Sequence, residues 1–216
     1  MLVCRQEETM RTEVIPEQFP QRSVLEESAR LAATNLEMSS RLSVLRLVLD
    51  APEFELGGYW QVESERDGLH AIMYASILDL LTPRTAAESR ARDLDEELLQ
   101  ELRVERIDRL RIDRWLHRNL LQLDDLLCKR IQPATLSRAD AAAFQACWEV
   151  WTDGRLKALS LPGISLAERR RVFFRTFAGR GLLLPRHWKV FHSLWDGEFS
   201  DHRGLIEASR RLPRLG

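Results

Sequence analysis

The chain is poor in several residue types, and each shortage excludes a class of protein. Its 216 residues include 3 cysteines and 10 glycines, and only three of its 32 basic residues are lysines. Cys4, Cys128 and Cys147 match no zinc or redox spacing, so we expect reduced, structural thiols in a reducing compartment. The scattered glycines form neither a dinucleotide-binding nor a P-loop fingerprint, which argues against the common nucleotide-binding enzymes.

Long hydrophobic runs are also missing. No run approaches the roughly 18–20 apolar residues that cross a bilayer, and the first residues carry acids where a signal peptide has an apolar core. A hydrophobic fraction of 44% and a charged fraction of 30% are typical of a folded globular chain. We therefore expect a cytoplasmic protein without membrane insertion.

Helix start and stop signals are abundant instead. Ser23 and Ser165 are each followed three residues later by a glutamate, the capping-box pattern of a helix start. Gly154, Gly179 and Gly197 follow apolar-periodic segments, where a helix commonly ends. Together these signals predict helices from Ser23 to a stop at Pro52, then over 68–81, 84–131 with a possible break within 103–112, 138–152, 166–178, 185–196 and 201–211.

The predicted fold class is therefore all-α, a compact bundle of about seven helices. Residues 1–21 form an irregular N-terminal lead-in, and residues 22–216 form a single helical domain. Alternating apolar residues on both sides of Gly57-Gly58 predict one small irregular or β-hairpin insertion near 51–67.

Charge and aromatic residues are unevenly distributed. Residues 1–83 carry 7 basic and 14 acidic residues, a net charge of −7, whereas residues 166–216 carry 11 and 5, a net charge of +6. Residues 132–216 also hold 10 of the 16 aromatic residues. These aromatics form either a packed core or a surface that anchors a partner. The candidate partner-surface residues are Trp188, Phe191, Trp195, Arg180 and Arg186.

Catalytic signals are sparse. His192 and Asp196 are four residues apart, but two ligands do not make a metal site, and the acidic pair Asp124-Asp125 is interpreted as solvated helix surface. Arg111-x5-His117 resembles the Arg-x4–6-His motif of the HEPN ribonucleases, and Arg186-x5-His192 matches it equally well. That resemblance implies a histidine acid or base and an arginine that holds the scissile phosphate.

By elimination, the sequence favours a non-enzymatic cytoplasmic adaptor, chaperone-like protein or regulatory subunit that binds another protein. Such a chain could be an accessory component of a larger bacterial assembly, and we assign it no cofactor, metal or catalytic residue. The alternative is a nucleic-acid-binding protein or a helical HEPN-like ribonuclease that uses an Arg-x5-His pair.

Overall fold

The structure is a computed structural model that describes residues 10–49, 59–76, 80, 107–132, 138–177, 184–199 and 201–212. The chain divides into two compact units, Met1–Leu116 and His117–Gly216, which we call the sheet unit and the helical unit. The boundary between them falls within the long helix α5 (Arg109–Leu127). Each unit has its own core and is described separately.

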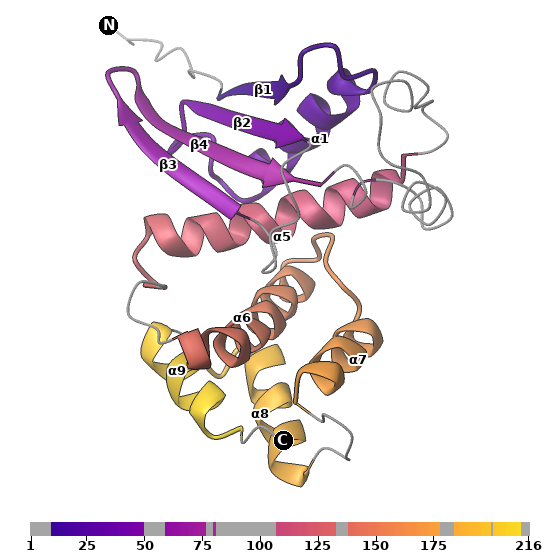
Figure 1. The fold of residues 1–216 in the computed structure, drawn as a ribbon, viewed down its shortest axis with the longest axis vertical. Helices are drawn as coiled ribbons and strands as arrows, with labels where there is room; N and C mark the ends of the chain where they lie inside the picture. The colour runs from indigo at the N-terminus through magenta and orange to yellow at the C-terminus, as the bar shows by residue number, and fades with distance from the viewer. Residues whose placement is uncertain are drawn as a thin grey trace, which may run out of the picture. The chain divides into compact units, whose positions relative to one another are not determined.

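The sheet unit is built on a four-stranded mixed sheet (Figure 1). Its elements are β1 (Arg11–Ile15), α1 (Arg22–Asn35), β2 (Val44–Leu49), β3 (Tyr59–Glu65) and β4 (Gly68–Ala75). The strand order is β1-β2-β4-β3. Strands β1, β2 and β4 are parallel to one another, and β3 pairs with β4 in the antiparallel direction.

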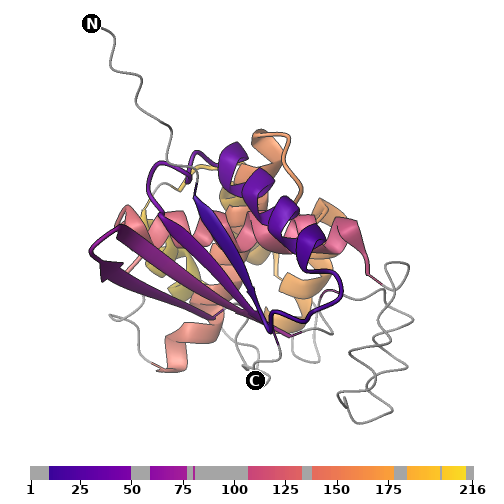
Figure 2. The ribbon, with the colours of Figure 1, turned by 90° about the horizontal axis from the view of Figure 1, so that it is seen from above.

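The two central strands have the composition of buried parallel strands. β2 reads VLRLVL, and its Leu45 and Leu47 are fully buried, as is Ala71 of β4. Strands covered on both faces read as near-continuous apolar runs rather than as alternating ones. Helix α1 connects the parallel strands β1 and β2 and lies along β1 (Figure 2), with Leu25 and Ala29 fully buried.

The prediction of an all-α bundle is wrong. The described residues contain a four-stranded sheet beside six helices, which is an α/β fold. The segment 68–81, predicted as a buried helix, contains strand β4, and the lead-in 1–21 contains strand β1. A short apolar run fits a buried strand as well as a buried helix, and only its pairing partners distinguish the two.

The predicted helix from Ser23 towards Pro52 is also wrong in its second half. Helix α1 begins at Arg22 and ends at Asn35, and the chain then continues into β2. The predicted capping box does not form, since the helix start has no side-chain cap hydrogen bond. Glu26 instead accepts a hydrogen bond from Arg22 Nε at 2.6 Å, and this bond raises the pKa of the arginine.

The helical unit packs short helices around α6 (Arg138–Ala158), which contacts each of the other three (Figure 1). These are α7 (Leu166–Phe177), α8 (Pro185–Trp195) and α9 (His202–Arg210). The predictions of helices over 166–178, 185–196 and 201–211 are confirmed to within two residues. At the start of α7, the Glu168 N–H donates to Ser165 Oγ at 3.3 Å, half of the predicted capping box.

Helix α6 continues beyond Gly154, where the sequence predicted that it would end. A Cβ atom at this glycine would lie 2.2 Å from the Trp195 carbonyl oxygen of α8. Gly154 is therefore required by the close approach of two helices rather than by a helix end.

Other predictions lie wholly or partly outside the described residues. They include the turn at Gly57-Gly58 and the part of the helix predicted over 84–131 that precedes residue 107. Within the described part, the β3–β4 turn lies at Arg66-Asp67, so the predicted strand near Trp60 exists but its partner follows it in the chain.

Candidate functional site

The predicted partner-surface residues on α8 belong partly to the core of the helical unit. Phe191 is fully buried. The Trp195 ring stacks on it, with ring centroids 6.2 Å apart and an interplanar angle of 11°, and the Trp188 ring meets it edge-on at 6.0 Å. Trp188 and Trp195 are half-buried, so each exposes part of a ring whose remainder packs on Phe191.

Of the two predicted arginines, only Arg186 lies within the described residues. Arg186 is exposed in the first turn of α8. Arg180 lies outside the described residues. Five further aromatics of this unit belong to its core, since the side chains of Phe144, Trp148, Trp151, Phe173 and Phe177 are all buried.

Arginine and histidine side chains also join α7 to α8. The Arg170 guanidinium lies 6.0 Å from the centre of the Phe191 ring. Its Nη2 lies 3.0 Å from His192 Nε2, within hydrogen-bond distance. The histidine of the second Arg-x5-His match is therefore engaged with an arginine other than Arg186.

The first Arg-x5-His match lies on α5. Arg111 and His117 are six residues apart, so an ideal helix turns them about 120° away from each other. His117 is 1% exposed, which leaves no solvent-facing acid or base at this position. This arrangement does not bring the two side chains to one substrate atom.

An exposed basic face on α7 is the strongest binding feature of the helical unit. Ala167, Arg171, Phe174 and Arg175 share the solvent side of the helix, opposite the buried Phe173. Phe174 is 37% exposed, whereas the other aromatics described in this unit are buried or half-buried. We call these four residues the α7 face.

A network of buried ion pairs lies deeper in the same unit, and the sequence interpretation missed it. Asp125 is fully buried and accepts hydrogen bonds from Trp148 Nε1 at 2.9 Å and from Arg155 Nη1 at 2.7 Å. The same Arg155 guanidinium stacks 3.6 Å above the Trp151 ring centre. Arg130 bridges Asp125 and Asp124, and its hydrogen bond to Asp124 raises the pKa of the guanidinium.

A second buried carboxylate extends this network to α7. Asp153 is fully buried; it accepts from Arg169 Nε at 2.6 Å and lies 3.0 Å from Arg118 Nε. Arg169 also donates to Glu149 and is itself 2% exposed. These bonds tie α5, α6 and α7 together through the buried Asp153 and Arg169, while Arg118 and Glu149 are 18% and 21% exposed.

The interpretation of Asp124-Asp125 as solvated surface is therefore wrong. Residues 119–125 of α5 are all buried, so this part of the helix has no solvated side. One signal could have indicated this. Asp124 lies four residues after Leu120 and three before Leu127, which places it beside the apolar stripe rather than opposite it.

Two further titratable side chains of the helical unit, besides Arg130, have shifted pKa values. Burial raises the pKa of the Cys147 thiol, so its reactive thiolate form is disfavoured. Burial also lowers the pKa of His202 from 6.5, although Asp201 opposes the shift. His202 packs edge-on against Phe144, with ring centroids 5.3 Å apart, and its Nδ1 accepts the Gln132 N–H at 3.4 Å.

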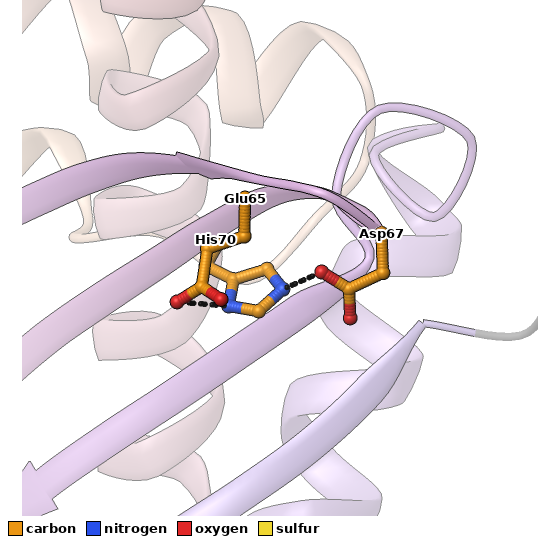
Figure 3. A group of neighbouring side chains, drawn as sticks. All are labelled: Glu65, Asp67 and His70. Atoms are coloured by element: carbon orange, nitrogen blue, oxygen red, sulfur yellow. Dashed lines mark hydrogen bonds and ion pairs between the residues drawn. The ribbon is translucent and has the colours of Figure 1, made fainter.

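A cluster of one histidine and two carboxylates lies in the sheet unit, at the turn between β3 and β4 (Figure 3). His70 of β4 lies between Glu65, the last residue of β3, and Asp67 in the turn. Its Nε2 is 2.8 Å from Asp67 Oδ1, and its Nδ1 is 3.4 Å from Glu65 Oε1. Asp67 and His70 are three residues apart across a turn, a spacing that the helical interpretation of 68–81 obscured.

No helix among the described residues is both long and apolar enough to cross a bilayer. The chain matches no protein-family model, no curated protein and no solved structure.

Proposed function

We propose that this chain is a non-enzymatic, cytoplasmic adaptor or regulatory subunit that binds an acidic surface of another protein through the α7 face. The observation that carries the proposal is the exposed Phe174 with Arg171 and Arg175 beside it. An aromatic ring in a basic surround is a common anchor in protein interfaces, where aromatic and arginine side chains are enriched at the energetic centre.

The charge of the two neighbouring helices supports an acidic partner. The exposed side chains of α7 and α8 include Arg171, Arg175, Arg186 and Lys189, whereas Glu168 is the one acid in the two helices. Complementary charge steers encounter and fixes orientation more than it adds affinity. An acidic protein surface would therefore meet this side of the helical unit in a preferred orientation.

The nucleic-acid alternative is less well supported by the exposed side chains. Binding of single strands needs several aromatic faces on which bases stack. Phe174 offers one such ring, while the Trp188 and Trp195 rings are half-buried against Phe191. The ribonuclease alternative is also less well supported, because the buried His117 does not face solvent, from which a substrate would approach.

A position-specific crosslinking experiment tests the proposal. A photoreactive phenylalanine analogue replaces Phe174 in the full chain, and the same analogue replaces Leu31 of α1, which is 55% exposed, as the control. We expect position 174 to crosslink a defined protein partner in the native host and position 31 not to do so.

Charge reversal then tests whether the partner surface is acidic. The double variant R171E/R175E should weaken capture of that partner by at least roughly tenfold, because like charges then face each other. The matched control R203E/R211E reverses two exposed arginines of the α9 region and should leave capture unchanged. Equal capture by both double variants would overturn the proposal. RNA or DNA binding at ~50 mM salt that R171E/R175E abolishes would favour the nucleic-acid alternative.

A further inference from the structure

The group at the β3–β4 turn has the geometry of a small metal site. We propose that it binds one divalent transition-metal ion, with His70 Nδ1 and a Glu65 carboxylate oxygen as ligands and with Asp67 orienting the imidazole. The site lies wholly in the sheet unit and is independent of the α7 face.

The backbone makes His70 the rigid member of the group. β4 lies between β2 and β3, and His70 is paired with Val44 on one side and Glu63 on the other. The His70 side chain is 8% exposed, whereas those of Glu65 and Asp67 are 53% and 59% exposed. The imidazole is thus held by the sheet, while the carboxylates leave a route for an ion from solvent.

The two ring nitrogens have different environments (Figure 3). The Nε2–Asp67 distance of 2.8 Å is that of a hydrogen bond, whereas the Nδ1–Glu65 distance of 3.4 Å is longer than the usual range of about 2.7–3.2 Å. An imidazole that binds a metal ion through one nitrogen keeps its N–H on the other, and Nε2, at hydrogen-bond distance from Asp67, is the nitrogen placed to carry it. The lone pair of Nδ1 then points towards Glu65.

This distance fits two ligands of one ion. Zinc binds histidine nitrogen and carboxylate oxygen at about 2.0–2.2 Å, so two ligands at a tetrahedral angle lie roughly 3.4 Å apart. The Nδ1–Glu65 separation is 3.4 Å. A carboxylate that accepts the other ring N–H, as Asp67 does, is the usual outer partner of a metal-binding histidine, because it fixes the tautomer and the ring orientation.

The turn holds Asp67 in this position. Ser43 Oγ donates to the Asp67 carbonyl oxygen at 2.7 Å, and the Ser43 N–H donates to the Leu69 carbonyl oxygen at 2.9 Å. Gly68 has φ +129°, and a Cβ atom there would lie 2.1 Å from Ser43 Oγ. The main chain at Asp67 is therefore fixed before any ion binds, and its carboxylate needs only a side-chain rotamer to reach the imidazole.

The ligand types select the class of ion. An imidazole nitrogen suits Zn²⁺, Ni²⁺, Cu²⁺ or Co²⁺, whereas Ca²⁺ and Mg²⁺ prefer oxygen ligands alone. Glu63 lies directly opposite His70 across the strand pair and adds negative charge beside the ion. Water completes the coordination, so we expect modest affinity rather than that of a closed structural site.

Zinc titration of the full chain tests the proposal. Calorimetry in metal-free buffer should show that one Zn²⁺ binds per chain. Co²⁺ bound in its place should give a visible absorption band typical of a nitrogen ligand. E65Q and H70Q should remove this binding, because each removes a ligand. D67N should weaken it by roughly 10–100-fold, the usual effect of losing the outer carboxylate. E207Q, which alters an exposed acid of α9, should bind as the unaltered chain does.

Several results would overturn the proposal. These are no Zn²⁺ binding at millimolar concentration, unchanged binding in E65Q or H70Q, or a preference for Ca²⁺ over Zn²⁺. If circular dichroism shows that H70Q is unfolded, E65Q decides, because the half-exposed Glu65 can be changed without disturbing the core. R171E/R175E should leave Zn²⁺ binding intact, so failure of the metal site and failure of the docking proposal are distinguishable.

Discussion

The two units bury their charged residues differently. In the sheet unit, the ion pairs Arg46–Glu13, Arg22–Glu26 and Arg109–Glu27 all retain solvent exposure, and the buried side chains of β2 and β4 are apolar apart from His70. In the helical unit, Asp125 and Asp153 are fully buried with arginine partners. Backbone pairing between strands holds the sheet, whereas the helices, whose backbone bonds are internal, are joined by side chains. Charged side chains therefore carry part of the connection between helices.

The largest expected effect comes from breaking a buried pair. D125A leaves Arg155 and the Trp148 indole N–H without their acceptor in the core. Removing one partner of a buried ion pair typically lowers the free energy of unfolding by about 3–5 kcal/mol. Urea denaturation followed by tryptophan fluorescence measures it.

The matched variant in the sheet unit is E13Q, which breaks the half-exposed pair with Arg46. Exposed pairs contribute about 0–1 kcal/mol. E13Q should therefore lower the free energy of unfolding several times less than D125A does. If D125A and E13Q lower the free energy of unfolding equally, buried ion pairs stabilise the chain no more than half-exposed ones do.

A second variant tests how tightly the helices approach each other. In an exposed helix, replacing glycine by alanine stabilises by about 1 kcal/mol. At Gly154 the new methyl group would meet the Trp195 backbone, and overpacking of this kind costs about 1–3 kcal/mol. We therefore expect G154A to lower the melting temperature of the chain.

Gly204 of α9 provides the control for this variant. Its nearest obstacle is the Phe199 ring edge, 3.0 Å from the position of a new Cβ, and a ring can shift where a backbone cannot. G204A should therefore lower the melting temperature less than G154A does. A rise in melting temperature for G154A would mean that α6 and α8 are not in close contact.

The smallest expected effect concerns pH. Burial lowers the pKa of His202 below 6.5, so at slightly acidic pH the unfolded chain binds a proton that the folded chain does not. The free energy of unfolding should therefore fall as pH drops below about 6.5, and this histidine should contribute no pH dependence above that value.

Urea midpoints at pH 7.5 and pH 5.5 measure the effect of His202. H202Q should lose less stability between these pH values than the unaltered chain, because it has no proton to bind. If both chains lose the same amount, the buried environment of His202 does not oppose its charge, and acid sensitivity of the helical unit must come from the carboxylate network.

Part of the fold could be predicted from local sequence. Helices α7, α8 and α9 are predicted to within two residues because their signals are local: Ser165 caps the start of α7, and Gly197 follows the end of α8. The Asp201 cap of α9 is a further local signal that the sequence interpretation did not use. Of the candidate partner surface, Arg186 is exposed while Phe191 is buried. A Trp–Phe–Trp stripe at helical spacing has the same sequence pattern whether it faces the core or solvent.

The sheet could not be predicted in the same way. The runs in β2 and β4 are apolar at nearly every position, so neither a period of two nor one of 3.6 residues stands out. The conformation of β2 depends on pairing with β1 and β4, which are distant from it in the sequence, and only the β3–β4 pairing is local. The group of Glu65, Asp67 and His70 depends on strand pairing as well, because the β3–β4 hairpin brings Glu65 next to His70.

The sequence alone determined where the last three helices begin and end, because capping groups satisfy backbone hydrogen bonds within a few residues. Tertiary structure alone decided that Val44–Leu49 and Gly68–Ala75 are strands, because their backbone hydrogen bonds are made to other segments. It also decided that Asp125 is buried, since the arginine and tryptophan that make this possible lie more than 20 residues away in the chain.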